Sequence, residues 1–154
     1  MTALILALLL VDVTEVAVHR TPGKPMQFFE PNRPAEEILA KKEGDKLLLC
    51  VRVNVPRDGV KAYREERAEL TPKEWASLLD IVSKEKLLDW KPEPEKGQVF
   101  DWGEAGIRIT SDRENAHTWT APLKNESGPA ALSRRLAALA AEKVKGLKLF
   151  YLAP

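Results

Sequence analysis

The stretch "LTPKEWASLLDIVSKEKLLDW" (residues 70–90) predicts the clearest helix of the chain. Thr71 can cap its first turn, Pro72 suits the first helical position, and Glu74 completes a Thr-x-x-Glu capping box. An apolar stripe follows at positions i, i+3, i+4 and i+7, formed by Trp75, Leu78, Leu79 and Val82. Because such a stripe has to be buried, we expect this helix to pack against a sheet.

The residues before this helix predict a β-hairpin. In "KLLLCVRVNV" (residues 46–55), the apolar residues at 47, 49, 51, 53 and 55 share one face at period two, and the other face changes from apolar to polar along the segment. This pattern predicts a strand with one face on the core. "PRDG" (56–59) predicts a tight turn, because Asp-Gly tolerates the positive φ that short hairpins require. "VKAYREERAEL" (60–70) then returns as an edge strand with charges on both faces.

The second half of the chain repeats this order. "GIRIT" (106–110) and "AHTWTA" (116–121) predict a second hairpin. "SGPAALSRRLAALAAEKVKG" (127–146) predicts a second helix, and "LKLFYL" (147–152) a closing strand. The predicted fold class is therefore α+β, an antiparallel sheet of about five strands with two main helices packed on one face. The apolar face of the second helix comprises Leu132, Leu136, Leu139 and Ala140.

The segment between the N-terminus and the first hairpin is less regular. "RTPGKPMQFFEPNRP" (20–34) carries four prolines and a glycine and predicts a connector. "PAEEILAKKEG" (34–44) is interpreted first as a short helix, capped near Asn32 and ended by Gly44. The alternative is the first arm of a hairpin that turns at "KEGD" (42–45).

The N-terminal residues 1–18 allow two interpretations. The apolar run from Ala3 to Val11 is too short to span a membrane, but it fits the central region of a signal peptide. Against a signal peptide, no Lys or Arg precedes the run, and the nearest small-x-small site, ending at Ala17, has Glu15 at its third-from-last position. The alternative is a buried N-terminal strand. Extracytoplasmic and cytoplasmic locations are therefore equally supported.

Composition limits the classes of function. At 154 residues, the chain is expected to form a single domain over residues 1–154, with no transmembrane span. The 24 basic and 23 acidic residues form no basic block, so no nucleic-acid partner is expected. The single cysteine, Cys50, excludes an intrachain disulfide and is expected to be a structural thiol.

The sequence contains no recognisable catalytic, metal or cofactor motif. G-x-S-x-G, paired cysteines, His-x-x-x-His and a phosphate-cradling glycine loop are all missing. No cofactor and no metal is predicted, and enzymatic activity is uncertain, with a non-enzymatic protein favoured.

The segment "DWKPEPEKGQVFDWGEAG" (89–106) is the candidate binding site. It combines Trp90, Phe100 and Trp102 with the carboxylates of Asp101 and Glu104. Aromatic rings beside carboxylates can stack on a sugar or bind a protein partner, whereas rings that only close the end of the core would all be buried. If the segment binds a partner, at least one ring should be exposed.

We therefore expect a small non-enzymatic α+β domain that binds an unidentified protein or other macromolecular partner, through its sheet face or the 89–106 segment. The alternative is an enzyme with a polar site around Asp101, Glu104 and His117. A third hypothesis is an accessory subunit whose N-terminal strand completes the sheet of a partner.

Overall fold

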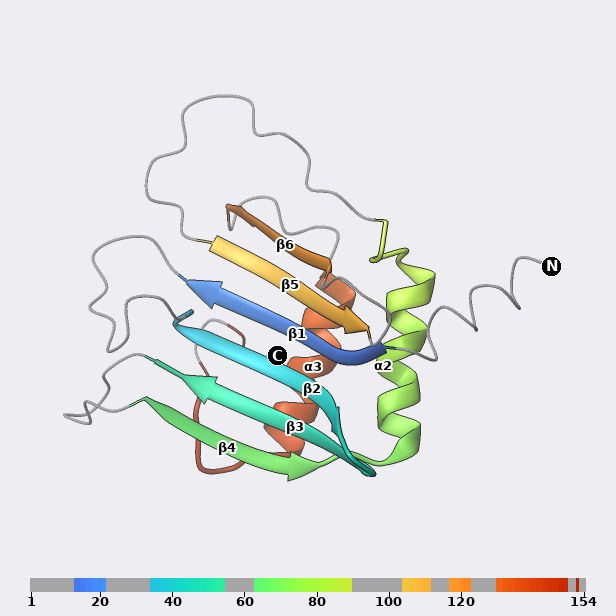
Figure 1. The fold of residues 1–154 in the computed structure, drawn as a ribbon. Coiled ribbons are helices and arrows are strands. Elements are labelled where there is room, and N and C mark those ends of the chain that lie inside the picture. Colours follow the sequence, from blue (N-terminus) through green and yellow to red (C-terminus); the bar gives the residue numbers. More distant parts are fainter. Residues whose placement is uncertain are drawn as a thin grey trace.

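The computed structural model describes residues 13–21, 34–54, 63–89, 104–111, 117–122, 130–149 and 152, with the backbone alone for Glu104 and residues 117–122. Figure 1 shows the elements that these residues form. The strands are β1 (Val13–Thr21), β2 (Glu36–Glu43), β3 (Lys46–Val53), β4 (Arg64–Glu69), β5 (Glu104–Ser111) and β6 (His117–Pro122). The helices are α2 (Pro72–Lys84) and α3 (Ala130–Lys143).

The strands form one sheet of six, in the order β4-β3-β2-β1-β5-β6, and every neighbouring pair is antiparallel. In Figure 1 the strands lie in front and α3 lies behind them. Both helices contribute to the same core cluster on one side of the sheet. The predicted α+β class is confirmed, as are both main helices and the antiparallel pairing of β3 with β4 and of β5 with β6. The tight turn predicted at residues 56–59 lies outside the described residues.

The core lies between the sheet and the helices. Apolar side chains at alternate strand positions meet the apolar stripe of each helix, as binary patterning requires. The stripe of α3 is buried as predicted, but Leu79 of the α2 stripe is only half-buried and borders the core. The central members of the cluster are Val16, Val18, Ile38, Leu49, Val51, Ile107, Ile109, Trp75, Leu78, Val82, Leu132, Leu136 and Leu139.

The capping box of α2 is confirmed. Thr71 Oγ1 accepts a hydrogen bond from the Glu74 amide at 3.2 Å, and the Glu74 carboxylate accepts one from the Thr71 amide at 2.8 Å. Glu74 also pairs with Lys143 of α3 at 3.0 Å, and Arg135 donates to Ser77 at 3.1 Å. The first turn of α2 is therefore capped by residues that are close in sequence, and an ion pair joins it to the end of α3.

Residues 34–44 do not form the predicted helix. Residues 36–43 are strand β2, which turns through Gly44 (φ +61°) into β3, so the helix interpretation is wrong and the hairpin alternative is confirmed. The reason is tertiary context: β2 lies between β1 and β3, and both neighbours satisfy its backbone groups. Pairing on both sides outweighs the local helix propensity of Glu, Leu, Ala and Lys.

The N-terminal strand begins at Val13 and lies in the interior of the sheet, between β2 and β5. Val13, Val16 and Val18 belong to the core, and a bulge at Thr14 shifts the register with β5. For residues 13–18 the strand interpretation is thus observed, and residues 1–12 lie outside the described residues. Whether the N-terminus is processed stays a prediction.

The predicted closing strand is not found where the structure describes it. Residues 147–149 are not in a strand, although Leu147 and Leu149 pack against the core. The segment is bonded instead to side chains: the Gly146 amide donates to Glu66 at 3.2 Å and the Leu152 amide to Glu36 at 2.9 Å. At these two amides, the carboxylates of Glu66 and Glu36 therefore accept the hydrogen bonds that a neighbouring strand would otherwise accept.

Candidate functional site

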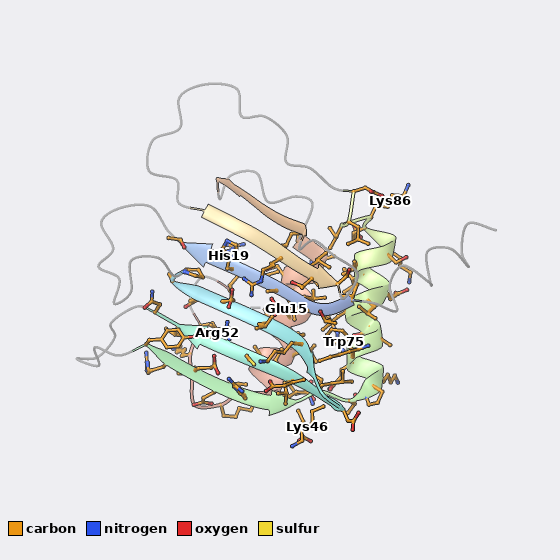
Figure 2. The ribbon with its side chains drawn as sticks, in the orientation of Figure 1. Glu15, His19, Lys46, Arg52, Trp75 and Lys86 are labelled. Atoms are coloured by element: carbon orange, nitrogen blue, oxygen red, sulfur yellow. The ribbon has the colours of Figure 1, made fainter. Side chains whose placement is uncertain are left out.

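The sheet face opposite α2 and α3, here called the polar face, carries most of the described ion pairs. Register places Glu65, Arg52, Glu37 and His19 in one row across β4, β3, β2 and β1. Figure 2 labels Glu15, His19 and Arg52, which extend from this face. Successive residues of a strand point to opposite faces of the sheet. These polar side chains therefore lie on the face opposite to the core valines that are next to them in sequence.

Six of these side chains form a continuous chain of ion pairs, here called the charge ladder. Successive members are joined at 2.6, 2.6, 2.7, 3.2 and 2.6 Å, so each contact is within hydrogen-bond distance. The ladder crosses five neighbouring strands, from the β4 edge to β5, and its charges alternate in sign. Its members, in order, are Arg67, Glu65, Arg52, Glu37, Arg108 and Glu15.

Glu37 is the centre of the ladder. Its side chain is only 7% exposed, and its two oxygens accept separate hydrogen bonds, Oε1 from Arg52 Nη1 and Oε2 from Arg108 Nη1. A buried carboxylate is tolerated when it is paired and hydrogen-bonded in this way. The two guanidinium groups are thereby held on either side of one fixed anion.

An apolar cluster lies beside the ladder on the polar face. Ala17, Leu39 and Cys50 are adjacent in register and buried, with Arg108 and Arg67 at the two ends of their row. Long arginine side chains can cover apolar neighbours with their aliphatic stems. Burial raises the pKa of the Cys50 thiol, which fits a structural role for this residue better than a reactive one.

Pairing in the ladder shifts the pKa values of Glu65 and Arg52 toward their charged forms. Burial by itself raises the pKa of Glu65, but hydrogen bonds from Arg52 and Arg67 outweigh it, and the net pKa is lowered. For Arg52, burial lowers the pKa, and the hydrogen bonds to Glu65 and Glu37 more than reverse this effect. The pairing of Arg52 with Glu65 therefore favours the charged forms of both side chains.

A hollow opens on the polar face beside Glu37. It has a volume of about 390 Å³, which falls in the range of small-molecule and side-chain pockets. The Tyr63 hydroxyl lies 3.5 Å from Glu65 at its wall. The hollow thus presents guanidinium, carboxylate and phenol groups together. Its lining residues are Pro34, Glu37, Arg52, Tyr63, Glu65 and Arg108.

Acid should weaken the ladder in a defined pH window. Because the folded-state pKa of Glu65 is lowered, its contribution to stability is complete above the ordinary glutamate pKa and is lost as the pH falls through the folded value. We expect the difference in free energy of unfolding between the wild type and Glu65→Gln to be constant down to about pH 5 and to shrink below about pH 4.

Urea denaturation at a series of pH values measures this difference. Glu142→Gln, at an exposed position of α3, provides the baseline for a carboxylate outside the ladder. A wild-type advantage over Glu65→Gln that grows on acidification would contradict the assignment.

The residues predicted from sequence as a site are only partly placed. Trp90, Phe100, Asp101 and Trp102 lie outside the described residues, so the expected exposure of an aromatic ring stays a prediction.

The backbone does place the two remaining residues of the alternative enzyme site. Glu104 pairs with Pro122, and His117 pairs with Ile109, at opposite ends of the β5–β6 hairpin. The two pairs are five positions apart along β5, roughly 17 Å at the rise of an antiparallel strand. A site that used both residues would have to bridge this separation, and the enzyme hypothesis stays a prediction.

Comparison with known proteins adds no assignment. No protein-family model matches the chain, and no curated protein is significantly similar to it. Within the described ranges, no helix is long and apolar enough to cross a membrane. The same residues contain no group of three or more His, Cys, Asp or Glu side chains placed to hold a metal ion.

Proposed function

We propose that the chain is a non-enzymatic binding domain whose polar face docks a protein partner at the hollow beside Glu37. The observation that supports this proposal most is the pair Arg52 and Arg108, held by Glu37 yet 27% and 31% exposed. Arginine and tyrosine are the side chains most often responsible for affinity at protein interfaces, and Tyr63 lines the same hollow.

Preorganisation favours binding at this hollow. Each guanidinium is fixed by two carboxylates, Arg52 by Glu37 and Glu65, and Arg108 by Glu37 and Glu15. Ordering a long side chain on binding costs roughly 0.5–1.5 kcal/mol, and a side chain that is already held avoids most of this cost. A partner would therefore meet donors and acceptors in fixed positions.

The charge balance of the ladder favours protein over nucleic acid as the partner. The ladder contains three arginines and three glutamates and is neutral as a whole. A phosphate backbone is bound by clustered positive charge without interleaved carboxylates. A protein surface that carries both signs of charge is complementary to such a ladder.

Partner capture with matched variants tests the proposal. The full chain is immobilised and exposed to an extract of its native host, and the retained proteins are quantified by mass spectrometry. Affinity for each retained partner is then measured with wild type, Arg52→Ala and, as a control, Arg134→Ala, an exposed arginine on α3. We expect Arg52→Ala to weaken binding at least about tenfold and Arg134→Ala to leave it unchanged.

The same experiment tests the second surface predicted from sequence. Trp102→Ala is the variant for the 89–106 segment. A partner that loses affinity with Trp102→Ala but not with Arg52→Ala binds through that segment, and the polar-face proposal is then wrong. Circular dichroism and thermal unfolding of each variant establish that the comparison is made between folded proteins.

A further inference from the structure

A second concave site lies on the opposite side of the sheet. It is a groove of about 360 Å³ between α3 and the residues that follow it, 144–149, here called the C-terminal segment. Its floor is the buried Val51 of β3. The groove shares no lining residue with the hollow on the polar face, so the two sites are separate.

The wall on α3 is made of small side chains. Ala137, Ala140 and Ala141 occupy positions i, i+3 and i+4 and therefore share one face of the helix. Leu147 and Leu149 of the C-terminal segment form part of the opposite wall. Because these alanine side chains are small, they leave a space on this wall that larger residues would fill, and this space forms the groove.

The C-terminal segment is held in position by Glu66. The Gly146 amide donates to Glu66 Oε2, and Glu66 is the register partner of Val51, the floor residue. A Cβ at position 146 would collide with the Glu66 carboxylate, so any other residue here would require the Glu66 side chain to move. The wall formed by Leu147 and Leu149 therefore has a defined place relative to α3.

The lining combines an apolar interior with two cations. Apart from Lys145 and Lys148, the described side chains that line the groove are alanine, valine or leucine. Both lysines are exposed, and Lys145 Nζ also donates to the Ala141 carbonyl at 2.6 Å, at the end of α3. The groove is thus complementary to an apolar ligand that also carries a negative charge.

We propose that this groove binds a fatty acid, with the acyl chain against the alanines of α3 and the carboxylate beside Lys145 and Lys148. A peptide would bring an amide donor and acceptor with every residue, and apolar walls cannot satisfy these groups. A fatty acid has polar atoms at one end alone. Its chain gains from burial, and its carboxylate gains from the two ammonium groups.

The test is a titration of the full chain with dodecanoate below its critical micelle concentration, followed by calorimetry. We expect saturable binding of one ligand per chain. The affinity should rise about fourfold for each methylene added to a shorter acid until the groove is filled, because each buried methylene contributes a similar increment. Dodecylammonium, with the opposite charge, should bind more weakly.

Two alanine-to-tryptophan variants at exposed helix positions locate the ligand. Ala141→Trp places a large side chain at the groove wall, whereas Ala76→Trp places the same side chain on α2, which contributes no lining residue. We expect Ala141→Trp to weaken dodecanoate binding at least about tenfold and Ala76→Trp to leave it unchanged, since only the first displaces the chain. Thermal unfolding shows whether both variants are folded.

A third variant tests the headgroup contact. Lys145→Gln combined with Lys148→Gln should weaken dodecanoate binding by roughly two- to tenfold, as expected for exposed ion pairs, and should leave dodecanol binding unchanged. The proposal is overturned if dodecanoate shows no saturable binding, if Ala141→Trp binds it like wild type, or if dodecylammonium binds as tightly. These outcomes are independent of partner binding at the polar face.

Discussion

Leu78→Ala is expected to lower the free energy of unfolding by about 2–5 kcal/mol, the range for large-to-small substitutions in a packed core. Leu78 is 0% exposed and lies one turn from both Trp75 and Val82 on the buried stripe of α2. Truncation leaves a cavity between the helix and the sheet, since the backbone of β2 and β3 is held by strand pairing on both sides. Urea denaturation followed by tryptophan fluorescence measures the loss.

The neighbouring leucine is the matched control for this substitution. Leu79 is half-buried at the border of the same core, so Leu79→Ala should be clearly less destabilising, by about 1 kcal/mol. Equal losses for the two variants, or an unchanged midpoint for Leu78→Ala, would contradict the packing of α2 on the sheet. The stripe pattern in the sequence does not separate these two residues, because both fall on the apolar side of the helix.

Local signals in the sequence predict much of the fold. The capping box at Thr71 and Glu74 fixes the start of α2, and the alternation in residues 46–53 predicts β3. For residues 34–44 the helix interpretation is wrong and the hairpin alternative is correct. Glu, Leu, Ala and Lys favour a helix locally, and the segment itself carries no signal of the two strands that flank β2. Local propensity is thus most informative where an element also carries its own cap or turn.

The candidate site could not be predicted in the same way. Alternation within a strand indicates which residues share a face, but it does not show which strands are neighbours. Arg108 meets Glu37 across 71 positions of sequence and Glu15 across 93. The sequence predicts a site in the 89–106 segment because its rings and carboxylates are contiguous. The ladder, in contrast, forms only in the folded sheet, where β1 lies between β2 and β5.

A chain that begins at Val18 is expected not to fold, which is the largest effect predicted for this protein. The truncation removes Val13, Val16 and Ala17, each at most 1% exposed, from a strand paired on both sides. Burial of a valine contributes roughly 1.5 kcal/mol or more, and each lost strand pairing leaves backbone groups of β2 and β5 unsatisfied. Together these losses approach the roughly 5–15 kcal/mol that stabilises a typical domain.

The start at Val18 corresponds to a cut after Ala17, which is the nearest match to a small-x-small site in the N-terminal sequence although Glu15 does not fit it. Such a cut would fall inside β1 and would also remove Glu15, the partner of Arg108 at the end of the charge ladder. The control is a chain that begins at Asp12 and keeps all of β1. We expect cooperative thermal unfolding for the control and none for the shorter chain. A cooperative transition in the chain that begins at Val18 would show that β2 and β5 can close the sheet without the first half of β1.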